Sequence, residues 1–486
     1  MSGRGVALLA ACAWLAGCAS VDPYVAAPIA EHLQRADTVG DCARLFRDAD
    51  RRIDAAGVRD ASAPRVAGFP YLRVDRFTAA LALPAQQQRA FGPWSELMAR
   101  LDADARAAEL ANLGAGDLPP APAFDGCRYT LAVADGDRLT ALAAAAVVPD
   151  DYSDAARALG LYPLTQLAFA AGIAGWHDRT RAVFALPVEA LPVAGTLTHY
   201  APAAQPVAPP RAPRSAAFAL PAVGTAECAA LAARHAPRIV VDTVTADDRI
   251  GALVWRHGDG GPRVAVDVEA PVVYLRVAFM PFAGRVRAQL VYTFWFPARP
   301  AQAPLDPLAG ALDGLIWRVT LDDDGRALVY DTIHPCGCYH LFFPTGRVRA
   351  RPQPATLDEA MFAPQTLAAP AAGERIELRL AAVTHYVQRV RVVPLAAAPA
   401  GTVAYEVRDE AQLRTLPLPA GGTRSVYGPD GLIAGSERAE RYFFWPAGIA
   451  SAGQMRQWGR HATAFVGRRH FDDADLLDRY FELLPP

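Results

Sequence analysis

The stretch "GRVRAQLVYTFWF", residues 284–296, decides the fold class of the C-terminal half of this 486-residue chain. Apolar side chains occupy alternate positions in it: Val286, Ala288, Leu290, Tyr292 and Phe294. Successive side chains of a strand point to opposite faces of a sheet, so this period of two predicts an amphipathic β-strand.

The sequence around this stretch predicts more strands and short turns. Residues 315–333 read "LIWRVTL", "DDDG" and "RALVYDTI", which predicts a hairpin with a tight acidic turn. "RIELRL", residues 375–380, alternates in the same way. We therefore expect a β-rich, mainly antiparallel domain, with a short helix at residues 225–235 before it and a closing helix within residues 472–484.

The N-terminal half has the periodicity of helices instead. Apolar residues recur at helical spacing in residues 41–57 and again in residues 93–114. We expect a helix with paired charges in "GFPYLRVDRFTAAL", residues 68–81, and a hairpin or strand–turn in "CRYTLAVADGDRLTAL", residues 127–142. Residues 152–186 have a helical composition, and their apolar part, residues 161–176, is too short to cross a membrane, so it predicts a buried core helix.

A Pro/Ala-rich segment, residues 201–217, separates the two halves and predicts an extended spacer. We thus expect an α+β protein whose N-terminal domain is α-rich and whose C-terminal domain is β-rich. The predicted division is a signal peptide at 1–17, a tether at 18–37, an α-rich domain at 38–200, a linker at 201–217 and a β-rich domain at 218–486.

Composition excludes several classes of function. The formal net charge is -2, which offers no footprint for a nucleic acid. All 48 basic residues are Arg. A P-loop, a Schiff-base lysine and a SxxK nucleophile are therefore excluded, and the sequence contains neither HExxH nor GxSxG.

The first 20 residues have the form of an export signal. Arg4 precedes an apolar run from Val6 to Gly17 that fits a secretory signal. Residues 15–18, "LAGC", resemble the lipobox of bacterial lipoproteins. This resemblance implies cleavage before Cys18 and lipidation, including palmitate, on Cys18, which would hold the protein on the membrane. Ala19, where an Asp would signal retention at the inner membrane, implies sorting to the outer membrane, and we expect the periplasmic side.

Five cysteines remain after Cys12 and Cys18 are set aside: Cys42, Cys127, Cys228, Cys336 and Cys338. An oxidising compartment favours disulfides, and an odd number leaves at least one thiol outside an intrachain bridge. Cys42 and Cys127 share the N-terminal half, so we predict a disulfide between them.

The segment "HPCGCYH", residues 334–340, is the main candidate for chemistry. His334, Cys336, Cys338 and His340 are zinc-ligand types, but an ideal strand would place the two histidines about 20 Å apart. Only a bend at Pro335 and Gly337 would bring two or three of them together. The alternatives are a strained, reducible Cys336–Cys338 disulfide and a structural loop in which Cys228 bridges one of the pair; we favour the loop.

A second cluster lies near the C-terminus. Its basic side chains could bind an anion such as a phosphate or a glycan carboxylate, or could form salt bridges with Asp472, Asp473 and Asp475. The cluster comprises Arg456, Arg460, His461, Arg468, Arg469 and His470. His177, His199 and His385 are weaker candidates that could approach residues 334–340 in space.

These patterns predict the cellular location of the protein more clearly than its biochemical activity. The leading hypothesis is a lipid-anchored envelope protein that binds a ligand or a partner, such as another envelope protein or a glycan. The rival is a periplasmic enzyme that uses a metal, with zinc as the candidate, or a thiol in residues 334–340.

Overall fold

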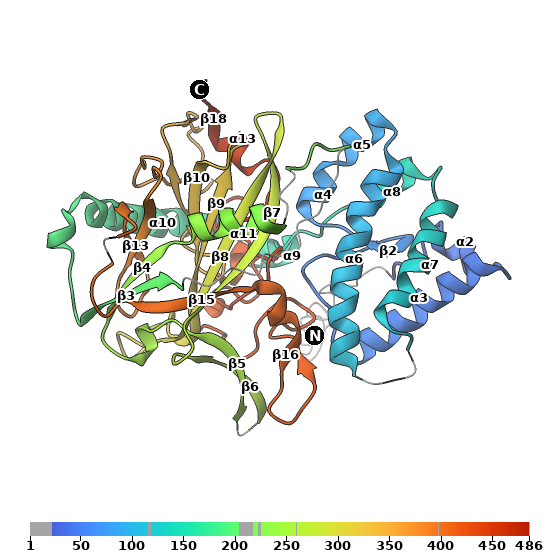
Figure 1. Ribbon diagram of the computed structural model, residues 1–486, viewed down its shortest axis with the longest axis horizontal. Coiled ribbons are helices and arrows are strands. Elements are labelled where there is room, and N and C mark those ends of the chain that lie inside the picture. Colours follow the sequence, from blue (N-terminus) through green and yellow to red (C-terminus); the bar gives the residue numbers. More distant parts are fainter. Residues whose placement is uncertain are drawn as a thin grey trace, which may run out of the picture.

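A helical domain and a larger domain built on a ten-stranded sheet make up the molecule (Figure 1). The computed structural model describes residues 22–485 except residues 115, 117, 204–216, 222–224, 259 and 397. The predicted signal peptide, Cys18 and most of the predicted linker lie outside the described residues. The α+β class is confirmed: helices dominate the first part of the chain and a mostly antiparallel sheet the second.

Helices packed around an apolar core form the first domain. They are α2 (Ile29–His32), α3 (Thr38–Ala55), α4 (Arg76–Ala80), α5 (Ala82–Gln88), α6 (Phe91–Leu113), α7 (Ala121–Ala134) and α8 (Leu139–Ala145), with a small hairpin of β1 (Arg65–Val66) and β2 (Phe69–Arg73). The Asp37 carboxylate caps α3 by accepting a hydrogen bond from the Gly40 amide. Phe46, Ala49 and Ile53 then bury one face of α3, as their spacing predicts.

Two local predictions in this domain were wrong. Residues 127–142 form the end of α7, a turn and α8 rather than a hairpin, because Phe124, Cys127 and Leu131 recur at helical spacing toward the core. The Asp-Gly turn joins two helices. Residues 68–81 form strand β2 and then α4, which begins where the Asp75 side chain caps it.

The helical domain is held by a disulfide and by buried charges. Cys42 of α3 and Cys127 of α7 are joined, as their shared place in the N-terminal half predicts. Asp102 of α6 lies at the centre of an ion-pair network and is fully buried. Its carboxylate accepts hydrogen bonds from three guanidinium groups, those of Arg73, Arg106 and Arg128. Arg73, one of the charges in residues 68–81, is paired in this way, whereas Arg76 pairs with Asp472 and Asp75 caps α4.

One sheet organises the second domain. Its strands are β3 (Thr196–Pro202), β4 (Arg238–Thr243), β7 (Val272–Phe282), β8 (Arg285–Arg299), β9 (Gly310–Leu321), β10 (Ala327–Ile333), β11 (Leu341–Pro344), β13 (Glu374–Leu380), β14 (Val387–Pro394) and β15 (Val403–Asp409). They lie in the order β11-β10-β9-β8-β7-β15-β3-β4-β13-β14. β15 is parallel to β3 and β7, and β4 is parallel to β13, whereas the other neighbours described are antiparallel. The predicted hairpin is confirmed as β9 and β10, closed by the turn at residues 322–325.

Strand β8 is buried on both faces. The prediction that it would be an amphipathic strand was therefore wrong. Tyr292 and Phe294 face the main core, where the Tyr292 hydroxyl donates to the Ala232 carbonyl of α11 at 2.7 Å. Val291 and Trp295 face cores on the other side of the sheet. Arg287 is also buried, because it forms an ion pair with Asp322. Because its charge is paired, the Arg287 side chain can be buried although the sequence pattern places it on the polar face.

Smaller elements cover the sheet. The helices are α9 (Asp154–Leu159), α10 (Tyr162–Ala185), α11 (Thr225–His235), α12 (Arg441–Phe444) and α13 (Leu476–Tyr480), with 3₁₀ turns η1 (Val188–Ala190), η2 (Ala246–Asp248), η3 (Glu410–Thr415) and η4 (Trp445–Ala447). The strand pairs are β5 (Ala252–Gly258) with β6 (Gly261–Asp267), β12 (Val348–Ala350) with β18 (Phe481–Leu483), and β16 (Leu416–Pro417) with β17 (Thr423–Arg424). The predicted closing helix is the short α13. No helix within the described ranges has both the length and the hydropathy needed to cross a bilayer.

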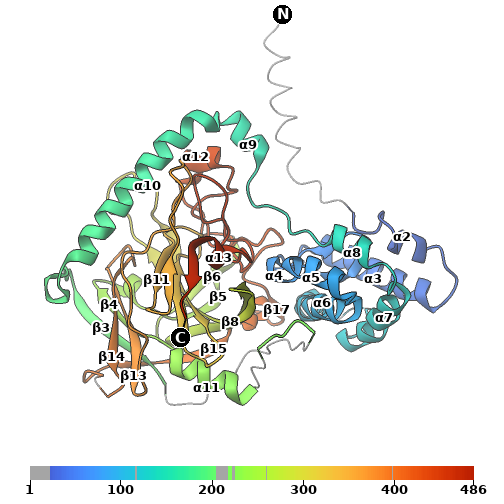
Figure 2. The ribbon, with the colours of Figure 1, turned by 90° about the horizontal axis from the view of Figure 1, so that it is seen from above.

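The domain boundary differs from the predicted one. β3 pairs with β4 and β15 inside the sheet, and α10 packs against the sheet through Phe184. Residues from α9 onward therefore belong structurally to the second domain, before the Pro/Ala-rich segment. In Figure 2, α10 runs along the sheet domain, away from the helical domain.

Polar contacts join the two domains. Arg76 of α4 donates to the Gly459 carbonyl and pairs with Asp472. The Asn112 amide at the end of α6 donates to the Arg414 carbonyl at 2.7 Å. Phe77 and Phe279 place their ring centroids 5.8 Å apart across the junction.

Candidate functional site

The loop of residues 334–340 leaves the end of β10 and turns back on itself. The His334 amide donates to the Cys338 carbonyl at 3.0 Å, and the Gly337 amide donates to the His334 carbonyl at 2.8 Å. Gly337 has φ +93°, and a Cβ there would lie 2.4 Å from the Ala462 carbonyl oxygen. A glycine is needed at this position for both reasons. The backbone therefore bends within residues 334–340, as a metal site formed by several of these residues would require.

The bend does not bring the four predicted zinc ligands together. His334 directs Nδ1 to the Asp313 carboxylate at 3.2 Å, whereas His340 directs Nε2 to Asp331 at 2.9 Å. Burial lowers the pKa of His340 to about 4. In the part of the chain that the structure describes, no group of three or more His, Cys, Asp and Glu side chains is arranged to hold a metal ion. These residues therefore do not fit a zinc centre.

His334 belongs instead to a buried acid–base cluster. The Asp313 carboxylate lies between His334 and His385, whose Nδ1 is 2.7 Å from it. The other ring nitrogen of His385 lies 3.4 Å from Asp248, and its ring stacks on Phe296 at a centroid distance of 3.8 Å. Asp248, His385, Asp313 and His334 thus form a continuous chain of titratable groups, which we call the His–Asp chain.

Opposing effects set the pKa values in the His–Asp chain. Burial alone would raise the pKa of Asp313, but the charges and hydrogen bonds of His334 and His385 hold it well below its usual value. Burial would lower the pKa of His385, but hydrogen bonds to Asp248 and Asp313 outweigh this effect and raise it. Burial prevails at His334, where the pKa is lowered. The chain can hold a proton on His385 while His334 stays neutral.

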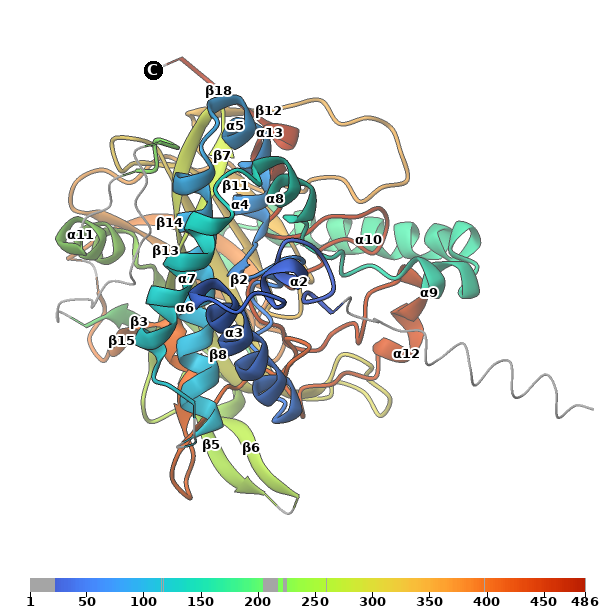
Figure 3. The same cartoon turned by 90° about the vertical axis from the view of Figure 1, so that its right-hand side faces the viewer.

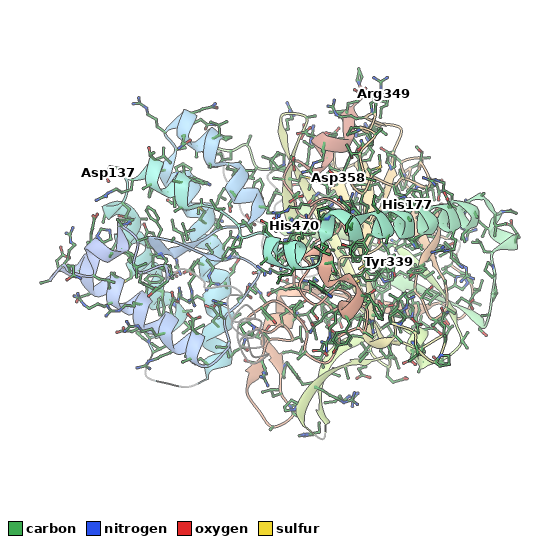
Figure 4. All side chains as sticks on the ribbon, turned by 180° about the vertical axis from the view of Figure 1, so that it is seen from behind. Asp137, His177, Tyr339, Arg349, Asp358 and His470 are labelled. Atoms are coloured by element: carbon green, nitrogen blue, oxygen red, sulfur yellow. A yellow bond between two sulfur atoms is a disulfide. The ribbon has the colours of Figure 1, made fainter. Side chains whose placement is uncertain are left out.

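Aromatic side chains cover the His334 end of the chain. Tyr339 and Tyr386 make edge-to-face contacts with the His334 ring at 5.2 and 5.6 Å. The Arg299 guanidinium donates to the Tyr386 hydroxyl at 3.2 Å. Trp176 of α10 lies 5.3 Å from Tyr339 between ring centroids, and Figure 4 shows Tyr339 beside α10. This packing holds the polar chain in place and leaves the histidine behind the two tyrosines.

The cysteines of the loop are thiols, and the favoured bridge from Cys228 was wrong. Cys228, Cys336 and Cys338 form no disulfide among the described residues. Cys228 lies in the apolar core that contains Phe279, whereas Cys336 lies in the core that contains Trp295, so the two cannot meet. Burial raises the pKa of the Cys228 thiol to about 11, which makes it a weak nucleophile.

Cys336 and Cys338 face each other. Their thiols share a hydrogen bond, and both residues line a small hollow together with Gly453 and Ala462. That hydrogen bond, followed by burial, raises the pKa of Cys338 well above its usual value. Burial also raises the pKa of the nearby Glu440 to about 7. The two thiols are therefore adjacent, and the raised pKa makes the Cys338 thiol a weak nucleophile.

The basic side chains of the predicted anion site near the C-terminus are paired with carboxylates and carbonyl groups of the protein itself. Arg468 pairs with Asp150 and Asp154, and Arg469 pairs with Glu359. Arg460 pairs with Asp151 and lies beside His470, which also contacts Asp151. Arg456 donates to the carbonyls of Cys336, Ala450 and Ser451. His461 is buried, with its pKa lowered to about 3 by burial. The cluster is salt-bridged, but its partners are mainly residues 150–154 and Glu359; of the predicted partners, Asp473 contacts His470, whereas Asp472 pairs with Arg76 and Asp475 with Arg479.

The three weaker histidine candidates lie in different parts of the structure. His385 reaches residue 334 through Asp313, which agrees with the predicted approach. His177 of α10 instead stacks on Phe362 at 4.1 Å, with its pKa lowered to about 4 by burial, and His199 pairs within the sheet opposite Val240.

A cleft between the two domains was not foreseen from the sequence. It has a volume of about 300 Å³ and lies between α6 and β7. Its apolar wall includes Phe77, Leu97, Leu101, Val277 and Phe279. Its polar groups include Asp75, Arg100, Arg276, Gln289 and Trp458. The Arg276 guanidinium lies 5.6 Å from the Trp458 ring centroid and is held by Glu410.

Comparisons with known proteins assign no relative to this chain. No family model, no curated protein and no solved structure matches it. Its function must therefore be inferred from the geometry of its own residues.

Proposed function

We propose that this chain is a lipid-anchored protein of the cell envelope that binds a ligand in the cleft between its helical domain and its sheet. The anchor is Cys18, in the lipobox-like residues 15–18, and Ala19 favours the outer membrane, on its periplasmic side. The Cys42–Cys127 disulfide is consistent with an oxidising compartment outside the cytoplasm.

The cleft is the observation that carries the binding proposal. Ligand sites are concave, mainly apolar and furnished with a few polar groups, and they favour domain junctions. This cleft has an aromatic and aliphatic wall, and Arg276 and Trp458 stand at one side of it. We therefore propose a small, partly apolar ligand whose polar group is recognised at the arginine side, where the lining also carries the carboxylates of Asp75, Asp104 and Asp472.

Filling the cleft tests this proposal. The probe is 8-anilino-1-naphthalenesulfonate, which combines an aromatic body with one negative charge. Leu101→Trp adds bulk at the cleft wall, and we expect it to remove one probe site from the binding isotherm. Ala99→Trp is the matched control, because Ala99 lies on the same helix but lines a separate hollow between α6 and α7.

The two variants distinguish the outcomes. An isotherm that Leu101→Trp leaves unchanged contradicts binding in the cleft. Loss of the site in Ala99→Trp alone would place the site in the other hollow and would also contradict the proposal.

Membrane fractionation tests the anchor separately. Cys18→Ala removes the residue to which lipid is attached in the lipoprotein family, so we expect the protein to leave the membrane fraction. Unchanged partitioning would argue against lipidation of Cys18 without bearing on the cleft.

The contact between Cys336 and Cys338 supports a second candidate function, thiol–disulfide exchange. In this reaction the two thiols give up two electrons and two protons to a small disulfide, which becomes two thiols, and an S–S bond forms between residues 336 and 338. Cys338 is partly exposed, so a small disulfide can reach it, and its raised pKa makes this exchange slow at neutral pH.

Alkylation after treatment with oxidised glutathione tests the exchange. We expect Cys336 and Cys338 to become resistant to alkylation in the unfolded protein, and dithiothreitol to restore both. Cys228 is the internal control, because it is buried and has no thiol partner among the described cysteines. If all three cysteines remain equally alkylatable after oxidation, the exchange is excluded.

A further inference from the structure

Helix α10 exposes much of the apolar stretch at residues 161–176, which contradicts the buried core helix that its composition predicts. Only His177 and Phe184, both in its C-terminal half, are buried among its described side chains. Leu164 is 66% exposed and Leu167 54%. Leu159 and Leu161, just before the helix, are also exposed. Exposed apolar residues gathered in this way mark interaction surfaces.

The neighbouring α12 and η4 carry further exposed aromatic side chains. Phe169 of α10 lies 5.6 Å from Phe444 between ring centroids, so the two elements pack side by side. On the outer side of that contact, Tyr442 and Phe443 are 66% and 64% exposed. Trp445 is exposed as well. We call the exposed residues Leu161, Leu164, Leu167, Tyr442, Phe443 and Trp445 the α10–α12 face.

The α10–α12 face is nearly free of charge. Residues 158–176 contain no charged side chain, and no Asp or Glu occurs between residues 441 and 451. Arg441 is the nearest basic residue in the aromatic segment, and its guanidinium donates to the Tyr442 hydroxyl. An aqueous surface seldom presents this composition, but the interface of a bilayer favours aromatic and aliphatic side chains flanked by arginine.

The N-terminal end of α10 lies on the side of the sheet domain that is nearer the helical domain, in which the described chain begins. In Figure 2, α9 and α12 lie at this end of α10, and in Figure 3 all three helices project past the helical domain. Residues 19–21 alone separate Cys18 from Asp22, the first described residue. Four residue steps span at most about 14 Å, so a lipid on Cys18 would hold this side close to the bilayer.

We propose that the α10–α12 face rests in the headgroup interface of the membrane that holds the Cys18 lipid. This inference relies on the anchor of the proposed function and is independent of the ligand cleft. Contact at two places, the lipid and the face, fixes the orientation of the protein: the sheet domain lies against the membrane along α10.

The depth of Trp445 in the bilayer tests the docking. The lipidated full chain is reconstituted into vesicles of phosphatidylethanolamine and phosphatidylglycerol, with or without brominated phosphatidylcholine, whose bromine quenches indole fluorescence at short range. The emission of Trp445 is taken as the difference between the protein and its Trp445→Phe variant. We expect brominated lipid to remove most of this difference emission.

Two further variants make the test specific. Leu164→Glu with Leu167→Glu places two charges on the face, and we expect it to abolish the quenching while the lipid keeps the protein on the vesicles. Val133→Glu is the control, because Val133 is 63% exposed but lies on α7 in the helical domain. We expect it to leave the quenching unchanged.

Other outcomes overturn the proposal in distinguishable ways. Protein that floats with the vesicles but shows no quenching retains the anchor and refutes the docking face. Protein that does not float at all contradicts both the anchor and the docking. A dimer in detergent that Leu164→Glu dissociates would show that a second copy, rather than the membrane, covers the face.

Discussion

Replacement of Asp313 by Asn should destabilise the sheet domain strongly. The Asp313 carboxylate is buried and accepts hydrogen bonds from both His334 and His385. Asn keeps one acceptor oxygen, but its amide group must face one of the two imidazole N–H groups. One charge-assisted hydrogen bond is then lost, and the charge that balances His385 disappears.

The size of the effect can be worked out from these two losses. A hydrogen bond to a charged group contributes about 1.5–3 kcal/mol, and breaking a buried pair on one side costs about 3–5 kcal/mol. Because Asp248 still faces His385 at 3.4 Å, compensation for its charge is only partly lost. We therefore expect Asp313→Asn to lower the free energy of unfolding by about 2–4 kcal/mol.

The cost should depend on pH with a definite sign. The raised pKa of His385 contributes stability that is fully present below its unfolded pKa, about 6.5, and is lost as the pH rises through the folded pKa. The lowered pKa of His334 acts in the opposite direction, since burial disfavours its charged form. Asp313 raises the pKa of both histidines, so its loss should cost more at about pH 5.5 than at about pH 8.5.

Urea unfolding followed by tryptophan fluorescence at these two pH values measures the cost. Asp267→Asn is a suitable control, since Asp267 lies on the same domain but is partly exposed and makes two long contacts, to Arg256 at 3.7 Å and to the Glu269 amide at 3.4 Å. A cost of Asp313→Asn equal to that of the control, or larger at the higher pH, would refute the electrostatic description of the His–Asp chain.

Three further changes test the scaffold. Replacing Cys42 and Cys127 by Ser opens a link between residues 85 apart, and the chain-entropy model predicts a loss of about 4–5 kcal/mol, measurable as a lower unfolding midpoint of the helical domain. Asp102→Asn leaves three buried guanidinium groups without their shared carboxylate and should cost about 3–5 kcal/mol in the same assay; a cost below that of an exposed Asp→Asn change would contradict the network. Gly337→Ala places a methyl group against the Ala462 carbonyl at a positive φ, so we expect a loss of about 2 kcal/mol or more by thermal unfolding, and wild-type stability would contradict the described loop.

Local periodicity predicted much of the fold. The alternation in residues 284–296 indicated β8, and the acidic turn indicated the β9–β10 hairpin. The alternation did not indicate that the polar face of β8 would be buried. Arg287 is buried because it pairs with Asp322, and Asp322 lies beside it only when the β9–β10 hairpin has formed. The Asp-Gly turn at residues 135–136 led to the wrong prediction of a hairpin or strand–turn. Such a turn can connect two helices as well as two strands.

The candidate site was only partly visible in the sequence. His334 was predicted as a zinc ligand and not as a member of the His–Asp chain, and His385 was noted as able to approach it. Asp313 and Asp248 were missed, since single carboxylates in or beside a strand carry no local signal, and only the pairing of β8, β9 and β10 brings residue 313 to the histidines. The exposure of α10 could not be predicted either, because the uncharged residues 161–176 have the same composition whether or not protein covers them.

Attachment of lipid to Cys18 underlies both the envelope assignment and the docking of the α10–α12 face. Mass analysis of the N-terminal peptide, from protein purified out of the membrane fraction, tests it most directly. We predict a mature chain that begins at Cys18 and carries acyl chains on that residue. A mature chain that begins elsewhere, or an unmodified Cys18, would contradict the lipid anchor and the docking that depends on it.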